Sequence, residues 1–221
     1  MFLIGVIRVI TITDEKLLKR HGEIIERALP GVKTISMCIE DQPKGIYDDY
    51  TEKIAIPKII RLAKDMEKKV HGIIISCAGD PAVDILSKEL KIPVIGAGRP
   101  TASLALSISD KIGVLGITDE PPRPFKEVLG DKIIAYEKPP HVETTIDLSK
   151  NKETIIEAAK KLEKAGAEVI ALACTGFSTI GIASILSKKL SIPVIDPVLA
   201  TATTMYYHIL FKYSIDEVLR K

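Results

Sequence analysis

The second half of the chain repeats the first. The segment GIIISCAGDPAVDILSKELKIPVIGAGRPTA (Gly72 to Ala102) matches VIALACTGFSTIGIASILSKKLSIPVIDPVLATA (Val169 to Ala202). Both contain Ser-Lys-x-Leu-x-Ile-Pro-Val-Ile followed by Thr-Ala, and both carry a cysteine where the first apolar run ends. A period of about 100 residues is far longer than the roughly 20 to 50 residues of a solenoid repeat. The repeat therefore predicts two duplicated lobes.

Each lobe has the pattern of an α/β fold. Short apolar runs alternate with helical patterns, which is typical of βα units and a mostly parallel sheet. Predicted strands are 3–10, 33–39, 72–76, 94–95, 111–117, 132–136, 168–173 and 194–195. Predicted helices are 15–28, 50–70, 82–90, 101–107, 122–129, 152–165, 179–190 and 199–212, with Asp14 and Asn151 as N-caps. The fold class is α/β, with two pseudo-symmetric lobes, each a mostly parallel sheet flanked by helices, and an active site in the cleft between them.

The boundary between the lobes is predicted near residues 96–100. The first lobe then comprises residues 1–97 and the second residues 98–202. Pseudo-symmetry suggests that the final segment, 203–221, packs back on the first lobe. Lobes of about 100 residues have the ordinary size of a domain.

Composition excludes several classes of protein. Lys and Arg number 31 against 29 for Asp and Glu, and the two signs are interleaved, so we expect no nucleic-acid partner and no membrane surface. The opening MFLIGVIRVI is too short and too interrupted by Arg8 for a signal peptide, and no apolar run of membrane-spanning length occurs, which favours a cytoplasmic protein. Abundant Ile, Lys and Glu without Trp favour a thermophilic source.

The residues that could bind metals or form disulfides are scattered. These are Cys38, Cys77, Cys174, His21, His71, His141 and His208. They form no Cys-x-x-Cys pair and no metal-ligand spacing, so we expect neither a metal site nor a disulfide framework. The glycine-containing stretches GAGRPT and GVLG lack the spacing of a phosphate-binding or dinucleotide-binding loop, so we expect no cofactor.

Cys77 and Cys174 occupy equivalent points of the repeat. Each follows a predicted buried strand, and ligands of parallel sheets bind beyond the carboxyl ends of strands. A helix beginning there should make each thiol lose its proton more readily than an ordinary cysteine. If the lobes face each other, one thiolate could remove a proton from a carbon while the opposite thiol returns one to the other face. A lone cysteine at a strand end is commonly a small core residue, which we expect for Cys38.

The cysteine motifs resemble a known superfamily. SCAGDPAVD around Cys77, ACTGFSTIG around Cys174 and the following IPVIDPV are similar to the aspartate/glutamate/hydantoin racemases, and most similar to their hydantoin racemase branch. The resemblance implies cofactor-independent racemisation of a small molecule, with Cys77 and Cys174 as the acid and base and nearby loop amides holding substrate oxygens. It also implies two pseudo-symmetric lobes and a homo-oligomer.

Two departures bear on the substrate. The amino-acid racemases commonly have Asn-Thr after the first cysteine and often a His at the end of the second motif, whereas Cys77 is followed by Ala-Gly-Asp and Cys174 by Thr-Gly-Phe. Arylmalonate decarboxylases of the same superfamily keep only one of the two cysteines, so the presence of both here argues against that branch. A hydantoin ring carbon is activated by its neighbouring carbonyl and carries no carboxylate charge, which suits a thiolate base. The alternatives are an amino-acid racemase of the same superfamily and a two-lobed binding or sensor protein without catalysis.

Seven further residues are candidates for substrate binding. They are Arg8, Ala78, Gly79, Asp80, Thr118, Thr175 and Gly176. Several have a structural alternative: Asp80 and Thr118 could each cap the helix that follows, and Arg8, inside an apolar strand, could pair with a buried acidic residue. Glycine and small residues after a cysteine let the backbone approach a ligand closely. The loop GIYDDY could close over the cleft and bring Tyr47 to it.

Overall fold

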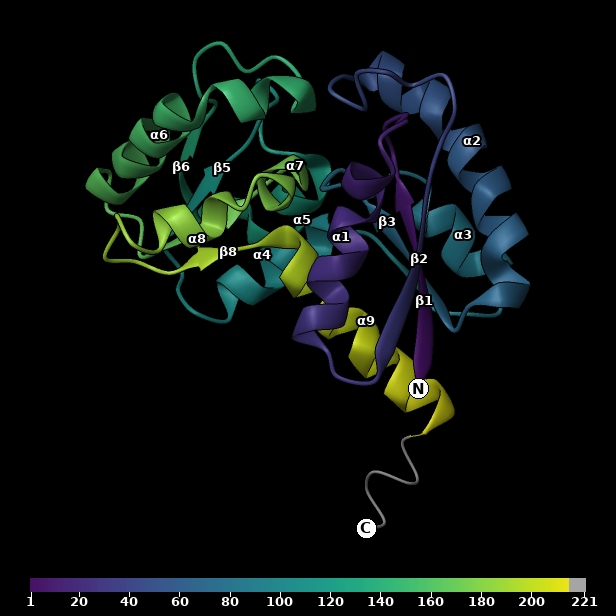
Figure 1. Ribbon diagram of the computed structural model, residues 1–221. Helices are drawn as coiled ribbons and strands as arrows, with labels where there is room; N and C mark the ends of the chain where they lie inside the picture. Colours follow the sequence, from purple (N-terminus) through teal and green to yellow (C-terminus); the bar gives the residue numbers. More distant parts are fainter. Residues whose placement is uncertain (215–221) are drawn as a thin grey trace.

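The protein is described by a computed structural model that covers residues 1–214 and folds into two lobes (Figure 1). The first lobe contains a sheet of order β2-β1-β3-β4, and the second a sheet of order β6-β5-β7-β8. Every strand pairing in both sheets is parallel. The predicted α/β class with two pseudo-symmetric lobes is confirmed, because the two sheets have the same strand order one repeat apart.

The strands coincide closely with the predicted apolar runs. They are β1 (Phe2–Arg8), β2 (Val32–Cys38), β3 (Gly72–Ser76), β4 (Val94–Ile95), β5 (Ile112–Leu115), β6 (Ile133–Glu137), β7 (Val169–Leu172) and β8 (Val194–Ile195). The central strands β3, β5 and β7 are buried along their full length, as parallel strands covered on both faces should be.

Helices cover both faces of each sheet. The α-helices are α1 (Glu15–Ala28), α2 (Asp49–Met66), α3 (Val83–Glu89), α4 (Gly98–Leu106), α5 (Arg123–Leu129), α6 (Lys152–Lys164), α7 (Gly176–Thr179), α8 (Ile182–Leu186) and α9 (Pro197–Tyr213). The 3-10 turns are η1 (Glu67–Lys69), η2 (Gly130–Lys132) and η3 (Thr145–Lys150). Helices α2 and α3 pack on one face of the first sheet and α1 and α9 on the other, while α6 and α8 oppose α4 and α5 across the second sheet.

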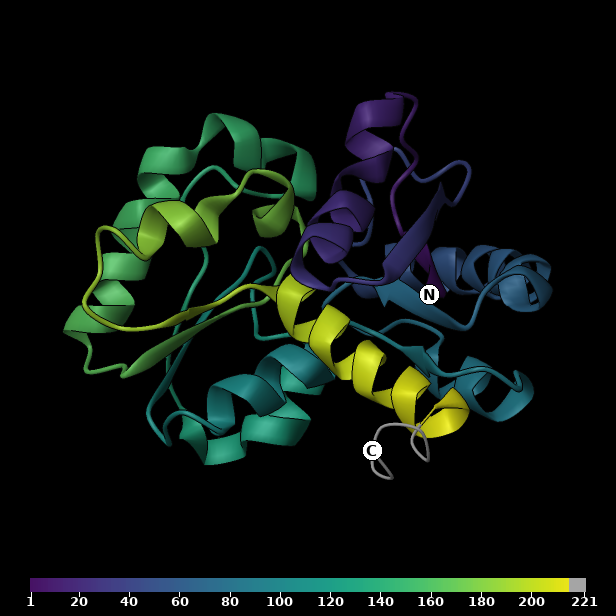
Figure 2. The same cartoon turned by 60° about the horizontal axis from the view of Figure 1, so that its bottom comes forward.

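The lobes exchange one helix each. Helix α4 follows β4 of the first sheet, but its Ala102 and Ala105 belong to the core of the second. Helix α9 follows β8 of the second sheet but runs along the first lobe (Figure 2), and its Met205 and Ile209 pack on the first sheet. Residues 203–214 therefore lie on the first lobe, and residues 215–221 of the segment expected to do so lie outside the described residues. The boundaries at 97/98 and 202/203 stay a prediction.

Some local expectations need correction. The predicted helix 179–190 has the wrong bounds: α7 begins earlier, at Gly176, and ends at Thr179, and α8 covers only Ile182–Leu186, because Gly181 between them has a positive φ of 67°. Part of the expected loop 137–147 is the turn η3. Asp14 caps α1 through its side chain, as predicted. Asn151 stands at the N-cap of α6 but makes no side-chain cap, because its amide donates to the carbonyls of His141 and Asp147.

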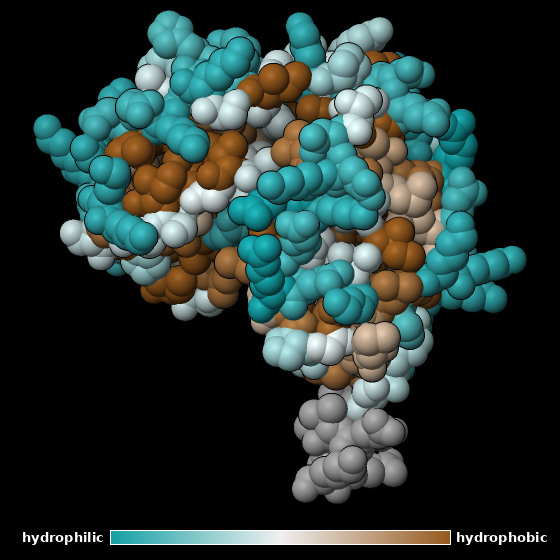
Figure 3. Space-filling view, in the orientation of Figure 1, coloured by the Kyte–Doolittle hydropathy of each residue, from teal (hydrophilic) through white to brown (hydrophobic). Residues whose placement is uncertain are grey.

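Hydrophilic side chains cover much of both lobes on the face shown in Figure 3. This distribution agrees with the interleaving of positive and negative residues along the sequence. Within residues 1–214, no helix has both the length and the apolar character needed to cross a membrane.

The exchanged helices are capped in two different ways. The N-terminus of α9 is capped by Asp196 on its own strand end, whose Oδ1 accepts from the N–H groups of Val198 and Leu199. The equivalent residue before α4 is Gly96, and the carboxylate comes instead from Asp80, which accepts from the N–H groups of residues 98 and 99 at 2.6 and 2.9 Å. In the second lobe the hydroxyl of Ser178 donates to the capping carboxylate of Asp196 at 2.8 Å.

Gly96 leaves the space that Asp80 occupies. A Cβ at position 96 would lie 2.8 Å from the Asp80 Cβ and closer still to its carboxylate. We expect Gly96→Ala to lower the free energy of unfolding by roughly 1 to 3 kcal/mol, because the carboxylate must leave the start of α4. Urea unfolding of the single variant and of Gly96→Ala in an Asp80→Ser background measures this. The loss should be much smaller in the Asp80→Ser background, and equal losses would contradict the argument.

Candidate active site

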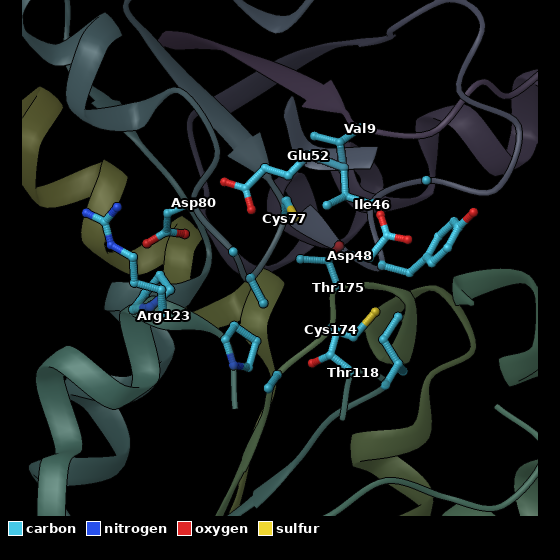
Figure 4. Close-up of a pocket in the computed structure, with 18 of the residues that line it drawn as sticks. Val9, Ile46, Asp48, Glu52, Cys77, Asp80, Thr118, Arg123, Cys174 and Thr175 are labelled. Carbon is cyan, nitrogen blue, oxygen red and sulfur yellow. The ribbon is translucent and has the colours of Figure 1, made fainter. Parts of the chain in front are cut away.

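Both repeat cysteines open onto one cleft between the lobes. The cleft has a volume of about 1150 Å³. Cys77 follows β3 directly, Cys174 lies two residues beyond β7, and both line the cleft wall (Figure 4). The duplicated motif thus brings one thiol from each sheet to a shared space, as ligand sites at the carboxyl ends of parallel strands require.

The surroundings of the two thiols differ. The sulfur of Cys174 lies 3.2 Å from the hydroxyl oxygen of Thr145 and accepts a hydrogen bond from the backbone N–H of Gly176 at 3.4 Å. Positive charge on Arg8 also favours the Cys174 thiolate, whereas the negative charges of Asp80 and Glu52 oppose ionisation of Cys77. If one of the two thiols ionises, these contacts favour Cys174.

The expectation that both thiols lose their protons easily is wrong. Burial raises the pKa of Cys77 and of Cys174 above that of an ordinary thiol. Helix α3 begins only at Val83, well beyond Cys77, and α7 is a single turn, so neither helix offsets the loss of hydration.

All seven candidate substrate-binding residues line the cleft. Asp80 does not cap the helix that follows it; it caps α4 instead, and burial raises its pKa to about 6. Thr118 is no helix cap either, because its hydroxyl donates to the carbonyl of Glu120 while Pro122 precedes α5. Their side chains are therefore held by the protein at the edge of the cleft.

Thr175 and Gly176 contact the protein directly at the site. The Thr175 hydroxyl donates to the carbonyl of Ser76 at 3.0 Å and so joins the two cysteine motifs. At Gly176 a Cβ would lie 2.6 Å from the end of the Leu148 side chain and 3.3 Å from the Cys174 sulfur, so a side chain there would have to displace Leu148. Ala78 and Gly79 form the turn after Cys77, and a Cβ at position 79 would be 3.8 Å from that sulfur.

Arg8 has no acidic partner among residues 1–214, so the expected ion pair is wrong. It is 4% exposed, and its guanidinium donates to the carbonyls of Leu17 and Leu18 and to the hydroxyl of Thr179. Burial lowers its pKa to about 10, which still leaves the group charged at neutral pH. Carbonyl oxygens at the start of α1 therefore take the place of a carboxylate.

His21 is a buried residue behind the cleft that sequence reasoning missed. It is fully buried in α1, and its two ring nitrogens lie 2.7 Å from the hydroxyl oxygens of Ser76 and Thr179. Burial, together with the charges of nearby arginines, places its pKa well below the ordinary value, so the ring is neutral. His21 connects the residue before Cys77 to the helix after Cys174. A single histidine in a helical pattern gives no sequence signal of such a contact.

The loop GIYDDY contributes to the cleft, although part of it is helix. Tyr47 lines the cleft, as expected. Asp48 caps α2 in a reciprocal capping box with Thr51, so the second half of the segment begins that helix. Thr145 was also missed, because it lies in a stretch predicted to be a loop.

Within the described part of the chain, no three or more His, Cys, Asp or Glu side chains are grouped so that they could hold a metal ion.

Similarity to known racemases identifies this protein as an isomerase of the racemase class. The chain belongs to the Asp/Glu/Hydantoin racemase family, because residues 13–205 match the sequence model of that family. It is 27% identical over 166 residues to a hydantoin racemase from Paenarthrobacter aurescens, covering 71% of this chain and 70% of that protein.

The fold is similar to solved racemase structures. Allantoin racemase from Klebsiella pneumoniae has a TM-score of 0.84 at 20% identity, over 96% of this chain and 89% of that chain. Allantoin racemase from Pseudomonas fluorescens has a TM-score of 0.81 at 18% identity, over 95% and 91%.

The His21 contacts should contribute to stability. We expect His21→Ala to lower the free energy of unfolding by about 3 kcal/mol, because it leaves a cavity and removes the partner of the buried Ser76 hydroxyl and of the partly buried Thr179 hydroxyl. Urea unfolding measures the loss. His208→Ala, at an exposed position of α9, is the control and should change stability by less than about 0.5 kcal/mol. Equal losses in the two variants would show that the buried contacts contribute nothing.

Thr145 should ease ionisation of Cys174. Thr145→Val removes a donor to the thiolate, and we expect the pKa of Cys174 to rise by about one pH unit. The pH dependence of its reaction with a small alkylating reagent, in a Cys38→Ser and Cys77→Ser background, measures the shift. Thr145→Ser keeps the hydroxyl and should keep the original pKa. An unchanged pKa in Thr145→Val would rule out this hydrogen bond.

Proposed function

We propose that the protein is a cofactor-independent racemase of 5-substituted hydantoins, in which Cys77 and Cys174 exchange protons with the ring carbon from opposite faces. One thiolate removes the proton, the ring carbonyl takes up the charge as an enolate, and the opposite thiol donates a proton to the other face. The two cysteines end with their protonation states exchanged, and solvent restores them.

The observation that carries the proposal is the placement of two equivalent thiols at one cleft. Inversion at carbon needs a base on one face and an acid on the other. A duplicated fold supplies such a pair, because each lobe presents the same strand end to the shared space. The similarity to a hydantoin racemase supports the same reaction.

Two backbone amides suit the carbonyl oxygens of the substrate. Ala78 and Thr175 each follow a cysteine directly, and within residues 1–214 neither N–H donates a hydrogen bond to the protein. Donors that are fixed before the reaction stabilise an enolate oxygen without reorganisation. They would act next to the carbon held between the sulfurs.

The raised thiol pKa values favour a substrate whose carbon proton is already activated. A buried thiolate is costly to form at neutral pH, although it is a stronger base once formed, and general-base catalysis is most efficient when the pKa of the base lies near the working pH. The neighbouring carbonyl of a hydantoin lowers the demand on the base. A free amino acid makes a greater demand, because its carboxylate opposes further negative charge, and it remains the alternative substrate class.

Deuterium exchange tests the proposal directly. We expect the wild-type protein, incubated with one enantiomer of a 5-substituted hydantoin in deuterated water, to exchange the ring C–H while optical rotation decays to zero. Cys77→Ser and Cys174→Ser should each lose nearly all racemisation, and the losses should not add in the double variant, because the thiols act as a unit. NMR and polarimetry follow the two signals, after subtraction of the spontaneous rate.

Cys38→Ser is the matched control. Its thiol lies outside the cleft and accepts a hydrogen bond from the N–H of Ile12, so racemisation should be unchanged. If the double variant racemises as fast as wild type, the thiols are not the bases. If wild type is inert on hydantoins but racemises a free amino acid, the substrate assignment is wrong.

A further inference from the structure

Glu52 is a carboxylate at the proposed reaction site with no assigned role. It lies in the first turn of α2, and it lines the cleft beside Cys77 (Figure 4). The capping box of Asp48 and Thr51 fixes the start of this helix immediately before it. Glu52 therefore lies on a helix that fixes its position in the cleft wall, and it is not part of a loop.

The carboxylate of Glu52 lacks a donor. Among residues 1–214 it makes no hydrogen bond and no ion pair. Arg123 is the cation that acts on it electrostatically, but the guanidinium of Arg123 is bound to Glu127 and Asp84 at 2.7 and 3.3 Å. Partial burial and the nearby charge of Asp49 raise the pKa of Glu52, so an incoming donor would relieve an unfavourable charge.

The position of Glu52 determines which chemical groups of a substrate can lie beside its carboxylate. A substrate carbon between Cys77 and Cys174 places its immediate substituents near this carboxylate. In a hydantoin one neighbour of the reacting carbon is a ring N–H, which a carboxylate accepts in a strong, charge-assisted hydrogen bond. A free amino acid would present its own carboxylate to the cleft, and two like charges at short range repel.

We infer that Glu52 selects a neutral cyclic ureide, by accepting a hydrogen bond from a ring N–H and by repelling a substrate carboxylate. This inference rests on the proposed function and names the residue that sets its specificity. Specificity of this kind combines an attraction to one ligand with a repulsion of its competitor.

The attraction is tested with methylated substrates. In wild type, methylation of the ring N–H that bonds to Glu52 should raise KM about 10- to 100-fold. Glu52→Ala should raise KM for the unmethylated hydantoin by a similar factor and abolish the penalty of methylation. Hydantoins methylated at each ring nitrogen in turn identify the N–H. Asp65→Asn, an exposed change of the same charge on the same helix, is the control and should leave all values unchanged. An undiminished penalty in Glu52→Ala at both nitrogens would overturn the inference.

The repulsion is tested with a charged analogue. The ring-opened N-carbamoyl amino acid keeps the substituents of the hydantoin and carries a carboxylate. It should inhibit wild type weakly and Glu52→Gln at least tenfold more strongly. Because Gln has nearly the size of Glu, this gain reports the lost charge and not added room. Equal inhibition of the two proteins would remove the repulsive part of the inference.

Binding separates this inference from the reaction itself. Calorimetry of a hydantoin with a Cys77→Ser, Cys174→Ser protein, with and without Glu52→Ala, does not depend on turnover. Weaker binding without Glu52 supports the inference even if wild type fails to racemise hydantoins, in which case the proposed function alone is wrong. Racemisation and binding that are both unaffected by Glu52→Ala overturn the inference alone. Absence of hydantoin binding overturns both.

Discussion

Both cysteine turns depend on one buried set of hydrogen bonds between the lobes. Thr175, next to Cys174, donates to the carbonyl of Ser76, next to Cys77. His21 lies behind them, between the hydroxyls of Ser76 and Thr179. Buried polar groups are costly when unpaired, so this set favours a single arrangement of the lobes. The relative position of the two thiols follows from it.

The lobes share a fold but not the details of their polar groups. A carboxylate caps each exchanged helix, yet it comes from Asp80 in the cysteine turn of one repeat and from Asp196 at the strand end of the other. Gly96 leaves room for Asp80, and Ser178 donates a hydrogen bond to Asp196. Each thiol has a backbone donor, but the charge of Asp80 opposes ionisation of Cys77, whereas Thr145 and Arg8 favour that of Cys174, so two equivalent cysteines have unequal surroundings.

Burial sets the chemistry of the cleft more than helix ends do. The thiols, Asp80 and Glu52 all have raised pKa values because their charged forms lose hydration. The α4 amides supply hydrogen-bond donors to Asp80. The Glu52 carboxylate makes no hydrogen bond among residues 1–214, so a substrate can supply a donor to it.

The sequence by itself determined the two like lobes, nearly all strands and helices, and the two cysteines at matched strand ends. These features follow from the local periodicity of apolar residues and from a repeat that can be read directly in the amino-acid sequence. The tertiary structure alone decided that Asp80 caps a helix 18 residues on, that His21 and Thr145 reach the cysteine turns, and that the thiols are hard to ionise. Such contacts join elements far apart in the chain, and burial depends on how those elements pack, so no local pattern of residues contains them.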